Sequence, residues 1–432
     1  MPRPAGIYRL AARAAVPLVP LLWRGDRQRA AHLARLAAPE AIERWARQHR
    51  DPSRPLAWFH APSVGEGLQA RAVIDAFRTL HPGVQFVYTH FSPSAEVVAR
   101  GIGADWSGYL CYDRAADVGR MLGAVAPELL VFVKLDVWPE LTLDAKARGT
   151  RVALVAGTVQ PESGRLRWPS RALTREAYAA IDRVGAIATE DAERLVALGC
   201  PRERVTVTGD PRIDSVLDAV DATPDGDMLP TGDVARTLVA GSTWPRDEEV
   251  IIEAFAAIRQ SHPAARLIIA PHEPSPEHLA GVARLAGRRG LPEPVRLSAL
   301  DPTGAPAILL VDSVGRLARL YASGMAAYVG GGFGHRGIHS VLEPAAWSRP
   351  VLIGPHDRGS RDARLLERAG GLQRLSGKGA VGELARLWRN WLHDESNWRR
   401  AGEAARGALE RERGAAMRSA AVLTRLLGLT TP

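Results

Sequence analysis

The chain has 432 residues, and about 150 residues per domain gives two or three domains. Hydrophobic residues make up 46% and charged residues 24%, which excludes wholesale disorder and a membrane protein with many spans. The 56 basic and 47 acidic residues leave a net charge of +9, which favours an anionic partner such as nucleic acid, a membrane surface or a phosphorylated substrate. Two cysteines, Cys111 and Cys200, are too few for a disulfide framework or a zinc site and indicate a reducing compartment.

The N-terminal segment, residues 1–25, combines arginines with an apolar run. Arg3, Arg9 and Arg13 precede Ala14–Trp23, a run of ten residues that contains two prolines. The run cannot cross a hydrocarbon core, which needs about 20 apolar residues. Its flanking arginines favour a segment that lies on an anionic leaflet. A cleaved signal peptide and a helix packed on the protein's own surface are the alternatives.

The remaining chain alternates short apolar runs with longer helical patterns, as βαβ units do. In the first half, strands are expected at Leu56–His60, Gln85–Thr89, Leu129–Val133, Val152–Val155, Ala186–Ala188 and Val205–Thr208, and helices at Gly67–Leu80 and Asp191–Leu198. The segment Asp218–Gly232 is rich in Asp, Pro, Gly and Thr and indicates a linker. Strands resume at Thr237–Ala240, Arg266–Ile269, Ala307–Val311, Ala326–Val329 and Val351–Ile353.

This pattern predicts an α/β protein with two Rossmann-like parallel-sheet domains that face each other across a cleft. The predicted domains span residues 26–217 and 236–405, with a linker at 218–235. The C-terminal helix within residues 406–432 is expected to pack back on the first domain. Ligands of such sheets bind beyond the carboxyl ends of the strands, so the loops that follow the strands are the expected place for a site.

A glycine-rich loop follows the expected strand Ala326–Val329. Five of the eight residues in Gly330–Gly337 are glycine, and a helix is expected over Ile338–Trp347. Such a loop lets backbone N–H groups approach an anion at the helix N-terminus. A tight turn without a ligand is the alternative.

The same loop also matches two weaker patterns. The spacing of Gly332, Gly334 and Gly337 satisfies the dinucleotide fingerprint, but the loop comes late in the second domain rather than after a first strand, which disfavours NAD. His335 and His339 lack the intervening glutamate of a zinc-binding HExxH helix. We therefore expect neither an organic cofactor nor a metal.

Seven segments, in a fixed order, resemble motifs of the 3-deoxy-D-manno-octulosonic acid (Kdo) transferases of lipopolysaccharide synthesis, which have the two-domain GT-B fold. The segments are WFHAPSVGEGLQA (58–70), VKLDVWPE (133–140), TGDPRIDSV (208–216), AGSTWPRDEEVI (240–251), IIAPHEP (268–274), VDSVGRLARLY (311–321) and YVGGGFGHRGIHSVLEPAAW (328–347). Each motif alone is weak, but their joint order makes the resemblance specific. It extends over most of the chain.

Three departures from the family pattern are visible. Pro271-His272-Glu273 stands where many members have Pro-Arg-His, which moves or removes a cationic contact to the donor. Ser340 ends a Gly-Ile-His-Ser segment where many members have Gly-Gly-His-Asn, so an amide donor is lost. Asp136 stands where a glutamate is usual before the tryptophan. These forms resemble a divergent branch of the family.

The resemblance implies transfer of Kdo from CMP-Kdo to a hydroxyl of a lipid A precursor, with inversion at the anomeric carbon. It assigns acceptor binding to residues 26–217 and donor binding to residues 236–405. It also implies a peripheral or monotopic enzyme on the cytoplasmic face of the inner membrane. A GT-B transferase or epimerase that uses a UDP-sugar is the alternative. Nucleic-acid binding is disfavoured because the arginines are spread over amphipathic helices rather than clustered.

In the first domain the resemblance makes Glu66 the catalytic base, with Ser63 and Gly65 beside it in the substrate site. The spacing Ser63-x-x-Glu66 is also that of a capping box, in which the glutamate only satisfies a backbone N–H. Asp136 is the second catalytic candidate. Lys134 and Arg212 are expected to face the Kdo carboxylate or an acceptor phosphate, oriented by Asp136, and a structural Lys134–Asp136 ion pair is the alternative.

In the second domain the resemblance places donor contacts in three segments of the chain. A monophosphate leaving group can be stabilised by backbone donors without a divalent ion. Glu343 is expected to hold ribose hydroxyls. The remaining predicted donor contacts are Ser242, Thr243, Pro271, His272, Gly331, Gly332, Gly334, Gly337, His339 and Ser340. For Ser242 and Thr243, capping of the helix before Glu248 is the alternative, and for His272 an exposed loop position.

Overall fold

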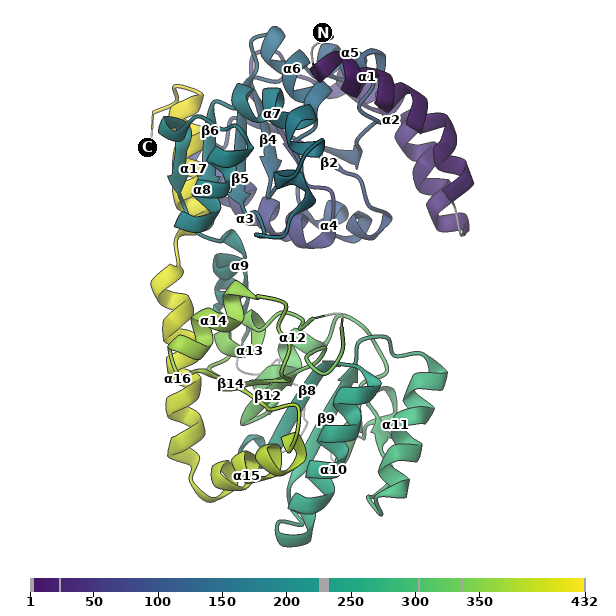
Figure 1. The fold of residues 1–432 in the computed structure, drawn as a ribbon, viewed down its shortest axis with the longest axis vertical. Helices are drawn as coiled ribbons and strands as arrows, with labels where there is room; N and C mark the ends of the chain where they lie inside the picture. The colour runs from purple at the N-terminus through teal and green to yellow at the C-terminus, as the bar shows by residue number, and fades with distance from the viewer. Residues whose placement is uncertain (1–3, 23–24, 225–232, 302–303, 336, 431–432) are drawn as a thin grey trace. The chain divides into compact units, whose positions relative to one another are not determined.

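The computed structural model describes residues 4–22, 25–224, 233–301, 304–335 and 337–430. The chain divides into two compact units: unit 1 comprises Met1–Ser215 and Arg413–Pro432, and unit 2 comprises Val216–Glu412. Each unit contains one seven-stranded parallel sheet with helices packed on it (Figure 1). The predicted α/β class with two parallel sheets is confirmed.

The sheet of unit 1 has the strand order β3-β2-β1-β4-β5-β6-β7. Its strands are β1 (Leu56–His60), β2 (Gln85–His90), β3 (Trp106–Tyr109), β4 (Leu129–Val133), β5 (Arg151–Gly157), β6 (Arg183–Ala186) and β7 (Val205–Val207). Its helices are α1 (Pro4–Ala15), α2 (Asp26–His49), α3 (Val64–Leu80), α4 (Glu96–Gly101), α5 (Ala115–Val125), α6 (Pro139–Ala147), α7 (Ser170–Ala180), α8 (Thr189–Leu198) and α17 (Ala415–Leu426). Helix α9 (Pro211–Asp221) leads into unit 2.

Alternate residues of the central strands pack into two separate cores, because successive side chains point to opposite faces of a strand. Trp58 and Leu130 join the core under α2, α5, α6, α7 and α8, whereas Phe59 and Val131 join the core under α3, α4 and α17. Both faces of β1 and β4 are therefore buried, as in parallel sheets generally. This explains why these strands are continuous apolar runs in the sequence.

The sheet of unit 2 has the order β10-β11-β9-β8-β12-β13-β14. Its strands are β8 (Thr237–Thr243), β9 (Arg266–Pro271), β10 (Val295–Arg296), β11 (Ile308–Leu310), β12 (Ala326–Val329), β13 (Val351–Ile353) and β14 (Leu372–Arg374). Its helices are α10 (Pro245–Ser261), α11 (Pro276–Arg288), α12 (Leu317–Leu320), α13 (Leu342–Ala346), α14 (Arg361–Arg368), α15 (Ala380–His393) and α16 (Glu395–Glu412). Side chains of α10, α11 and α15 share one core with this sheet.

The end of the chain returns to unit 1. Helix α17 packs on α3, and its Ala420 and Leu423 are buried in the core of unit 1. The carboxylate of Asp214 accepts hydrogen bonds from the backbone N–H groups of Gly414 (2.5 Å) and Ala416 (3.0 Å) at the start of α17. Helix α16 continues past residue 405, where the sequence placed a boundary.

Three strands were not predicted: β3, β10 and β14. They are short or carry polar residues, so their sequences give no clear apolar run. The predicted linker is partly wrong, because Asp218–Asp221 belong to helix α9. Residues 225–232 of that linker lie outside the described residues.

Helix α1 at the N-terminus packs on α6 and α7. Tyr8 Oη donates to Asp113 Oδ2 (2.8 Å), and Arg9 Nε donates to Glu140 Oε2 (2.6 Å). The predicted apolar run contributes a 3-10 helix at Val16–Leu22, and its Trp23 lies outside the described residues. In the described part of the chain, no helix is both long and apolar enough to cross a membrane.

Candidate functional site

One candidate site lies at the carboxyl ends of the unit 1 strands. Glu66 lies in the first turn of α3, directly after β1, and Lys134 directly follows β4. Lys134 Nζ donates to Glu66 Oε1 at 2.8 Å, and the Glu66 side chain is only 12% exposed. Its second oxygen, Oε2, is buried and has no hydrogen-bond partner in the described chain. Lys134 therefore fixes one carboxylate oxygen, and the other has no hydrogen-bond partner among the described residues.

The capping-box alternative for Glu66 is wrong. Ser63 is the N-cap of α3, but its side chain makes no capping hydrogen bond. The carboxylate of Glu66 contacts Lys134 rather than the backbone N–H of Ser63. Gly65 lies in the same turn with open space around its Cα. Glu66 therefore does not have the helix-capping role that the spacing Ser63-x-x-Glu66 allowed.

The alternative Lys134–Asp136 ion pair is also wrong. Asp136 Oδ1 accepts from Arg165 Nη2 (2.6 Å), and its Oδ2 accepts from Trp138 Nε1 (3.0 Å) and lies 3.9 Å from His60 Nε2. Burial alone would raise the pKa of Asp136, but His60, Arg165 and Trp138 outweigh burial and lower this pKa to about 2. Asp136 is therefore an ionised anchor for Arg165.

Arg212 and Asp136 are also not partners. Arg212 donates through Nε (2.9 Å) and Nη2 (2.5 Å) to Oδ2 of Asp210, and the buried Asp210 also accepts from Gln69 Nε2 of α3 (3.1 Å). Burial opposes ionisation of Asp210, but the guanidinium of Arg212 holds the pKa of this carboxyl below its ordinary value. Asp210, rather than the predicted Asp136, therefore orients Arg212.

Sequence reasoning missed Arg165, His60 and Asp210 as members of this set. His60 was visible as the last residue of a predicted strand, which is where site residues of parallel sheets lie. Its Nε2 is buried without a hydrogen-bond partner in the described chain, and its ring meets Trp138 edge-on at 5.8 Å. Arg165 had no such signal, because it lies in a long connection between β5 and α7.

A separate candidate site in unit 2 lies at the carboxyl ends of its strands, where Asp247 of α10 anchors the glycine loop. Asp247 Oδ1 accepts from Tyr328 Oη (2.7 Å), and Oδ2 accepts from the N–H groups of Gly331 (2.9 Å) and Trp244 (3.0 Å). This buried carboxylate joins β12, the loop and the start of α10. It was not predicted, although an Asp in the first turn of a helix is a visible signal.

The glycines of the loop differ in how tightly they are packed. Gly331 has φ +100°, and a Cβ there would lie 2.1 Å from the carbonyl oxygen of Gly337. A Cβ on Gly332 would lie 2.6 Å from the backbone nitrogen of Gly354. Gly334, in contrast, has no neighbour closer than 3.8 Å. Gly331 and Gly332 are thus required by close packing, whereas Gly334 is not.

The helix predicted over Ile338–Trp347 is shorter than expected. Helix α13 covers only Leu342–Ala346, because residues 337–341 continue the loop and Ser340 Oγ accepts from Leu342 N–H (3.4 Å). The loop therefore does not end at a helix N-terminus. The loop N–H groups without an acceptor in the described part of the chain include those of Gly332 and Phe333.

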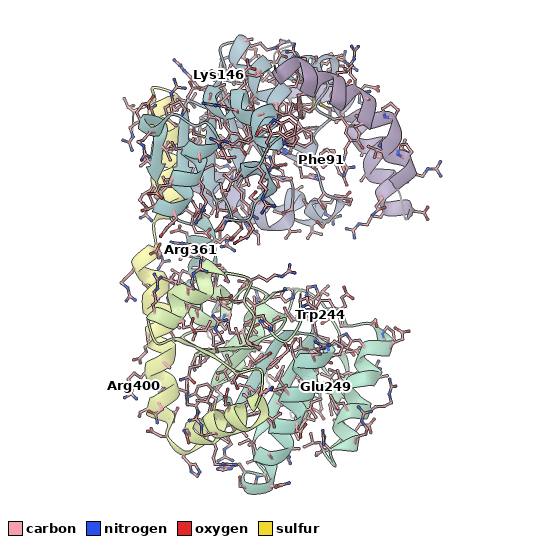
Figure 2. All side chains as sticks on the ribbon, viewed as in Figure 1. Phe91, Lys146, Trp244, Glu249, Arg361 and Arg400 are labelled. Atoms are coloured by element: carbon pink, nitrogen blue, oxygen red, sulfur yellow. The ribbon has the colours of Figure 1, made fainter. Side chains whose placement is uncertain are left out.

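Three aromatic rings stack beside the loop. Trp244 and His272 lie 4.8 Å apart between ring centroids, and His272 and His339 lie 4.2 Å apart at 24°. Trp244 follows β8 and His272 follows β9, so both belong to the carboxyl edge of the sheet (Figure 2 labels Trp244). His272 is exposed, and His339 Nε2 is buried without a hydrogen-bond partner in the described chain.

His339 should make the stability of unit 2 depend on pH. Burial and the neighbouring His272 lower the pKa of His339 from 6.5 to about 4. The unfolded chain therefore binds this proton at higher pH than the folded chain. The contribution of neutral His339 to the free energy of unfolding is complete above about pH 6.5 and is lost as the pH falls toward 4. Urea unfolding at pH 7 and pH 5 should show a smaller pH-dependent loss in His339→Gln than in the natural chain. The exposed His335 offers the control: His335→Gln should keep the natural pH dependence, and an unchanged pH dependence in His339→Gln would contradict the assignment.

Thr243 has a structural partner. Its hydroxyl donates to Glu248 Oε1 (2.8 Å), and the buried Glu248 also contacts His278 Nε2 (3.0 Å). Burial raises the pKa of Glu248. Ser242, next to it, adopts φ +51° and is half-buried. The hydroxyl of Thr243 therefore has a structural role, which was the alternative to donor binding.

Two other predicted donor contacts also lie at this edge. Pro271 ends β9 and is buried. Glu343 lies in α13, half-buried, and its side chain has no hydrogen bond or ion pair with another described residue. Gly337 adopts φ +83° and packs against Arg358.

Of the described His, Cys, Asp and Glu residues, no three lie close enough to hold a metal ion.

Comparisons with known proteins support one family. Residues 36–215 match the family model described as "3-Deoxy-D-manno-octulosonic-acid transferase (kdotransferase)". The 3-deoxy-D-manno-octulosonic acid transferase of Bordetella pertussis is 32% identical over 379 residues, which cover 83% of this chain and 85% of the relative. The enzyme of the same name from Haemophilus influenzae is 25% identical and covers 87% of this chain and 86% of the relative.

Solved structures share the fold. UDP-GlcNAc 2-epimerase from Neisseria meningitidis matches with a TM-score of 0.61 at 13% identity, over 87% of this chain and 99% of that structure. A glycosyltransferase from Rickettsia africae matches with a TM-score of 0.58 at 10% identity, over 87% of this chain and 100% of that structure. These likenesses concern the fold alone and confirm the predicted GT-B architecture.

Proposed function

Because the chain belongs to the 3-deoxy-D-manno-octulosonic acid transferase family and is thus a glycosyltransferase, we propose that it moves Kdo from CMP-Kdo to a lipid A precursor, a tetra-acylated disaccharide phosphate. The observation that carries this proposal is the carboxylate of Glu66, which Lys134 holds at Oε1 while Oε2 is buried and unpartnered. It lies where ligands of parallel sheets bind.

Glu66 acts as the general base. Inverting transfer requires a group that removes the proton from the attacking hydroxyl while positive charge develops at the anomeric carbon. Glu66 Oε2 accepts this proton, and Lys134 fixes the orientation of the carboxylate through Oε1. Asp136 acts through Arg165, which it holds as a cation for the carboxylate or phosphate of a substrate. Arg212, held by Asp210, supplies a second cation.

Unit 2 binds the donor. The N–H groups of Gly332 and Phe333 face no acceptor in the described chain and are suited to the phosphate of CMP. Ser242, His272 and His339 add polar groups near this loop, and Glu343 accepts ribose hydroxyls. Thr243 holds Glu248 in place rather than binding the donor directly.

Transfer should not need a divalent ion. A single phosphate leaving group carries less charge than a diphosphate, and backbone N–H groups with cationic side chains can stabilise it. Addition of a chelator to the purified enzyme should therefore leave the rate of transfer unchanged, as measured by product formation with and without added Mg²⁺. Strong inhibition by the chelator, reversed by Mg²⁺, would contradict this prediction.

The acceptor and the net charge of +9 support a membrane site of action. We assign the protein to the cytoplasmic face of the inner membrane as a peripheral or monotopic enzyme. An anionic leaflet attracts basic surfaces, at about 1 kcal/mol for each Lys or Arg close to it. The segment that follows α1 is the proposed contact.

One reaction tests the proposed function. Purified protein is incubated with CMP-Kdo and a tetra-acylated lipid A precursor, and the product is weighed by mass spectrometry. A mass increase of one or more Kdo residues is the expected result. A parallel incubation with UDP-sugars is the control: transfer or epimerisation of a UDP-sugar, without transfer of Kdo, would favour the alternative GT-B activity.

A further inference from the structure

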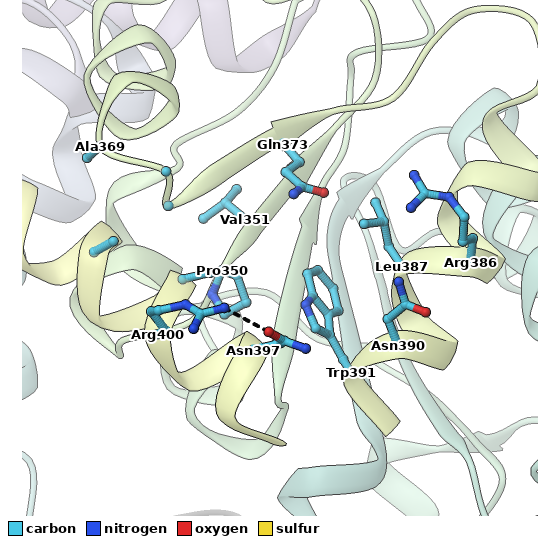
Figure 3. A pocket seen from close by; sticks show the side chains of 14 residues that line it. Pro350, Val351, Ala369, Gln373, Arg386, Leu387, Asn390, Trp391, Asn397 and Arg400 are labelled. Atoms are coloured by element: carbon cyan, nitrogen blue, oxygen red, sulfur yellow. Dashed lines mark hydrogen bonds between the residues drawn. The ribbon is translucent and has the colours of Figure 1, made fainter. Parts of the chain in front are cut away.

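Unit 2 has a cavity of about 560 Å³ between the last two strands of the sheet and helices α15 and α16 (Figure 3). Pro350 and Val351 line it at the start of β13, and Gln373 lines it from the edge strand β14. All strands of this sheet are parallel, so the start of β13 lies at the opposite edge from the glycine loop, which follows the carboxyl end of β12. The cavity is separate from the candidate donor site.

The charged residues that line this cavity are both arginines. Arg386 comes from α15 and Arg400 from α16, and no Asp or Glu lines the cavity. Arg386 has no hydrogen bond or ion pair with another described residue. Arg400 Nη2 donates to Asn397 Oδ1 (2.8 Å), so a neutral amide rather than a carboxylate orients it. Two guanidinium groups beside one cavity favour an anionic ligand, above all a phosphate.

Neutral polar groups complete the lining. The side chains of Gln373, Asn390 and Trp391 line the cavity and form no hydrogen bond with another described residue (Figure 3). Amides both donate and accept, and the indole N–H donates, so these groups match the hydroxyls of a sugar. Trp391 is only 6% exposed, and its ring offers, with Leu387, an apolar wall for the C–H groups of a sugar ring.

The wall formed by α16 is rigidly placed. A Cβ on Gly371 would lie 2.5 Å from Ala405 Cα, and a Cβ on Gly402 would overlap the carbonyl oxygen of Ser348. Helix α16 thus rests directly on the backbone of the loops beside β13 and β14. A cavity whose walls are fixed before binding loses less entropy when a ligand enters.

We propose that this cavity binds a small phosphorylated sugar, with Arg386 and Arg400 on the phosphate and Gln373, Asn390 and the Trp391 N–H on the hydroxyls. The cavity volume falls within the range of about 300–1,000 Å³ that is typical of small-molecule sites. The site goes beyond the proposed transfer reaction, because it uses none of the residues assigned to Kdo transfer.

Isothermal titration calorimetry of the full chain with glucose 6-phosphate, inorganic phosphate and glucose tests this proposal. Glucose 6-phosphate should bind best, inorganic phosphate more weakly and glucose without measurable heat. The double variant Arg386→Gln/Arg400→Gln should weaken binding of glucose 6-phosphate by about tenfold or more, since the phosphate then loses its charge-assisted hydrogen bonds. Asn390→Ala should weaken glucose 6-phosphate but not inorganic phosphate.

Arg389→Gln is the matched control, because Arg389 is exposed on α15, the helix of Arg386, and does not line the cavity. This variant should bind glucose 6-phosphate as the natural chain does. Thermal unfolding checks that the double variant is folded, which its exposed positions make the expected result. Unchanged binding in the double variant, or equal affinity for glucose 6-phosphate and inorganic phosphate, would overturn the proposal.

Discussion

Replacing Glu66 by glutamine should lower kcat for Kdo transfer by about 10²–10⁴-fold, the usual contribution of a general base. Glutamine has nearly the same shape, and its amide oxygen can still accept from Lys134 Nζ, but it cannot take up a proton at neutral pH. The folded structure and donor binding should therefore be retained. Initial rates with CMP-Kdo and the lipid A precursor, together with CMP binding by calorimetry, separate these two effects.

Glu190→Gln is the control for this substitution. Glu190 is exposed and lies in the first turn of α8, as Glu66 lies in the first turn of α3, so both variants lose the same favourable interaction of a carboxylate with a helix N-terminus. Glu190→Gln should transfer Kdo at the natural rate. Near-normal turnover in Glu66→Gln would remove Glu66 from the role of base.

Replacing Gly332 by alanine should destabilise unit 2 by about 3 kcal/mol and weaken binding of the donor. The added Cβ would lie 2.6 Å from the nitrogen and 2.7 Å from the Cα of Gly354. Backbone cannot swing aside as a flexible side chain can, so either the loop or the segment after β13 must move. Urea unfolding of the variant measures the first effect, and calorimetry with CMP measures the second.

Gly334→Ala provides a control within the same loop. Its Cβ would have 3.8 Å to the nearest atom, the carbonyl oxygen of Gly331. This variant should unfold within about 0.5 kcal/mol of the natural chain, as substitutions away from special features usually do. Equal destabilisation by Gly332→Ala and Gly334→Ala would mean that close packing against Gly354 does not shape the loop.

Much of the fold could be predicted because buried parallel strands are continuous apolar runs. The expected bounds of β1, β4, β12 and β13 agree with the structure to the residue. Three edge strands were missed, since β3, β10 and β14 are two to four residues long and include exposed polar positions. Helix α13 was predicted too long because the apolar residues after Gly337 fit a helical pattern, although residues 337–341 belong to the loop.

Single site residues could be identified from the sequence more easily than the contacts between them. Lys134, Asp136 and Glu66 were all singled out, but the pairing of Lys134 with Glu66 joins residues 68 positions apart and cannot be read from local spacing. Asp136 pairs across 29 positions with Arg165, which no motif marked. Asp247 was overlooked for the same reason, because its role depends on Gly331, 84 positions later. Long-range contacts of this kind arise only when the sheet brings strand ends together.

The return of α17 to unit 1 has a consequence for the order of folding during synthesis. Ala420 and Leu423 fill the core beneath α3, and Gly414 and Ala416 supply the donors that satisfy Asp214, so residues 1–215 leave the ribosome without these partners. At about 5–20 residues per second, synthesis of unit 2 takes roughly 10–40 s before the last segment emerges. During that interval unit 2 can fold completely, whereas unit 1 exposes an apolar face on α3 that a chaperone could bind.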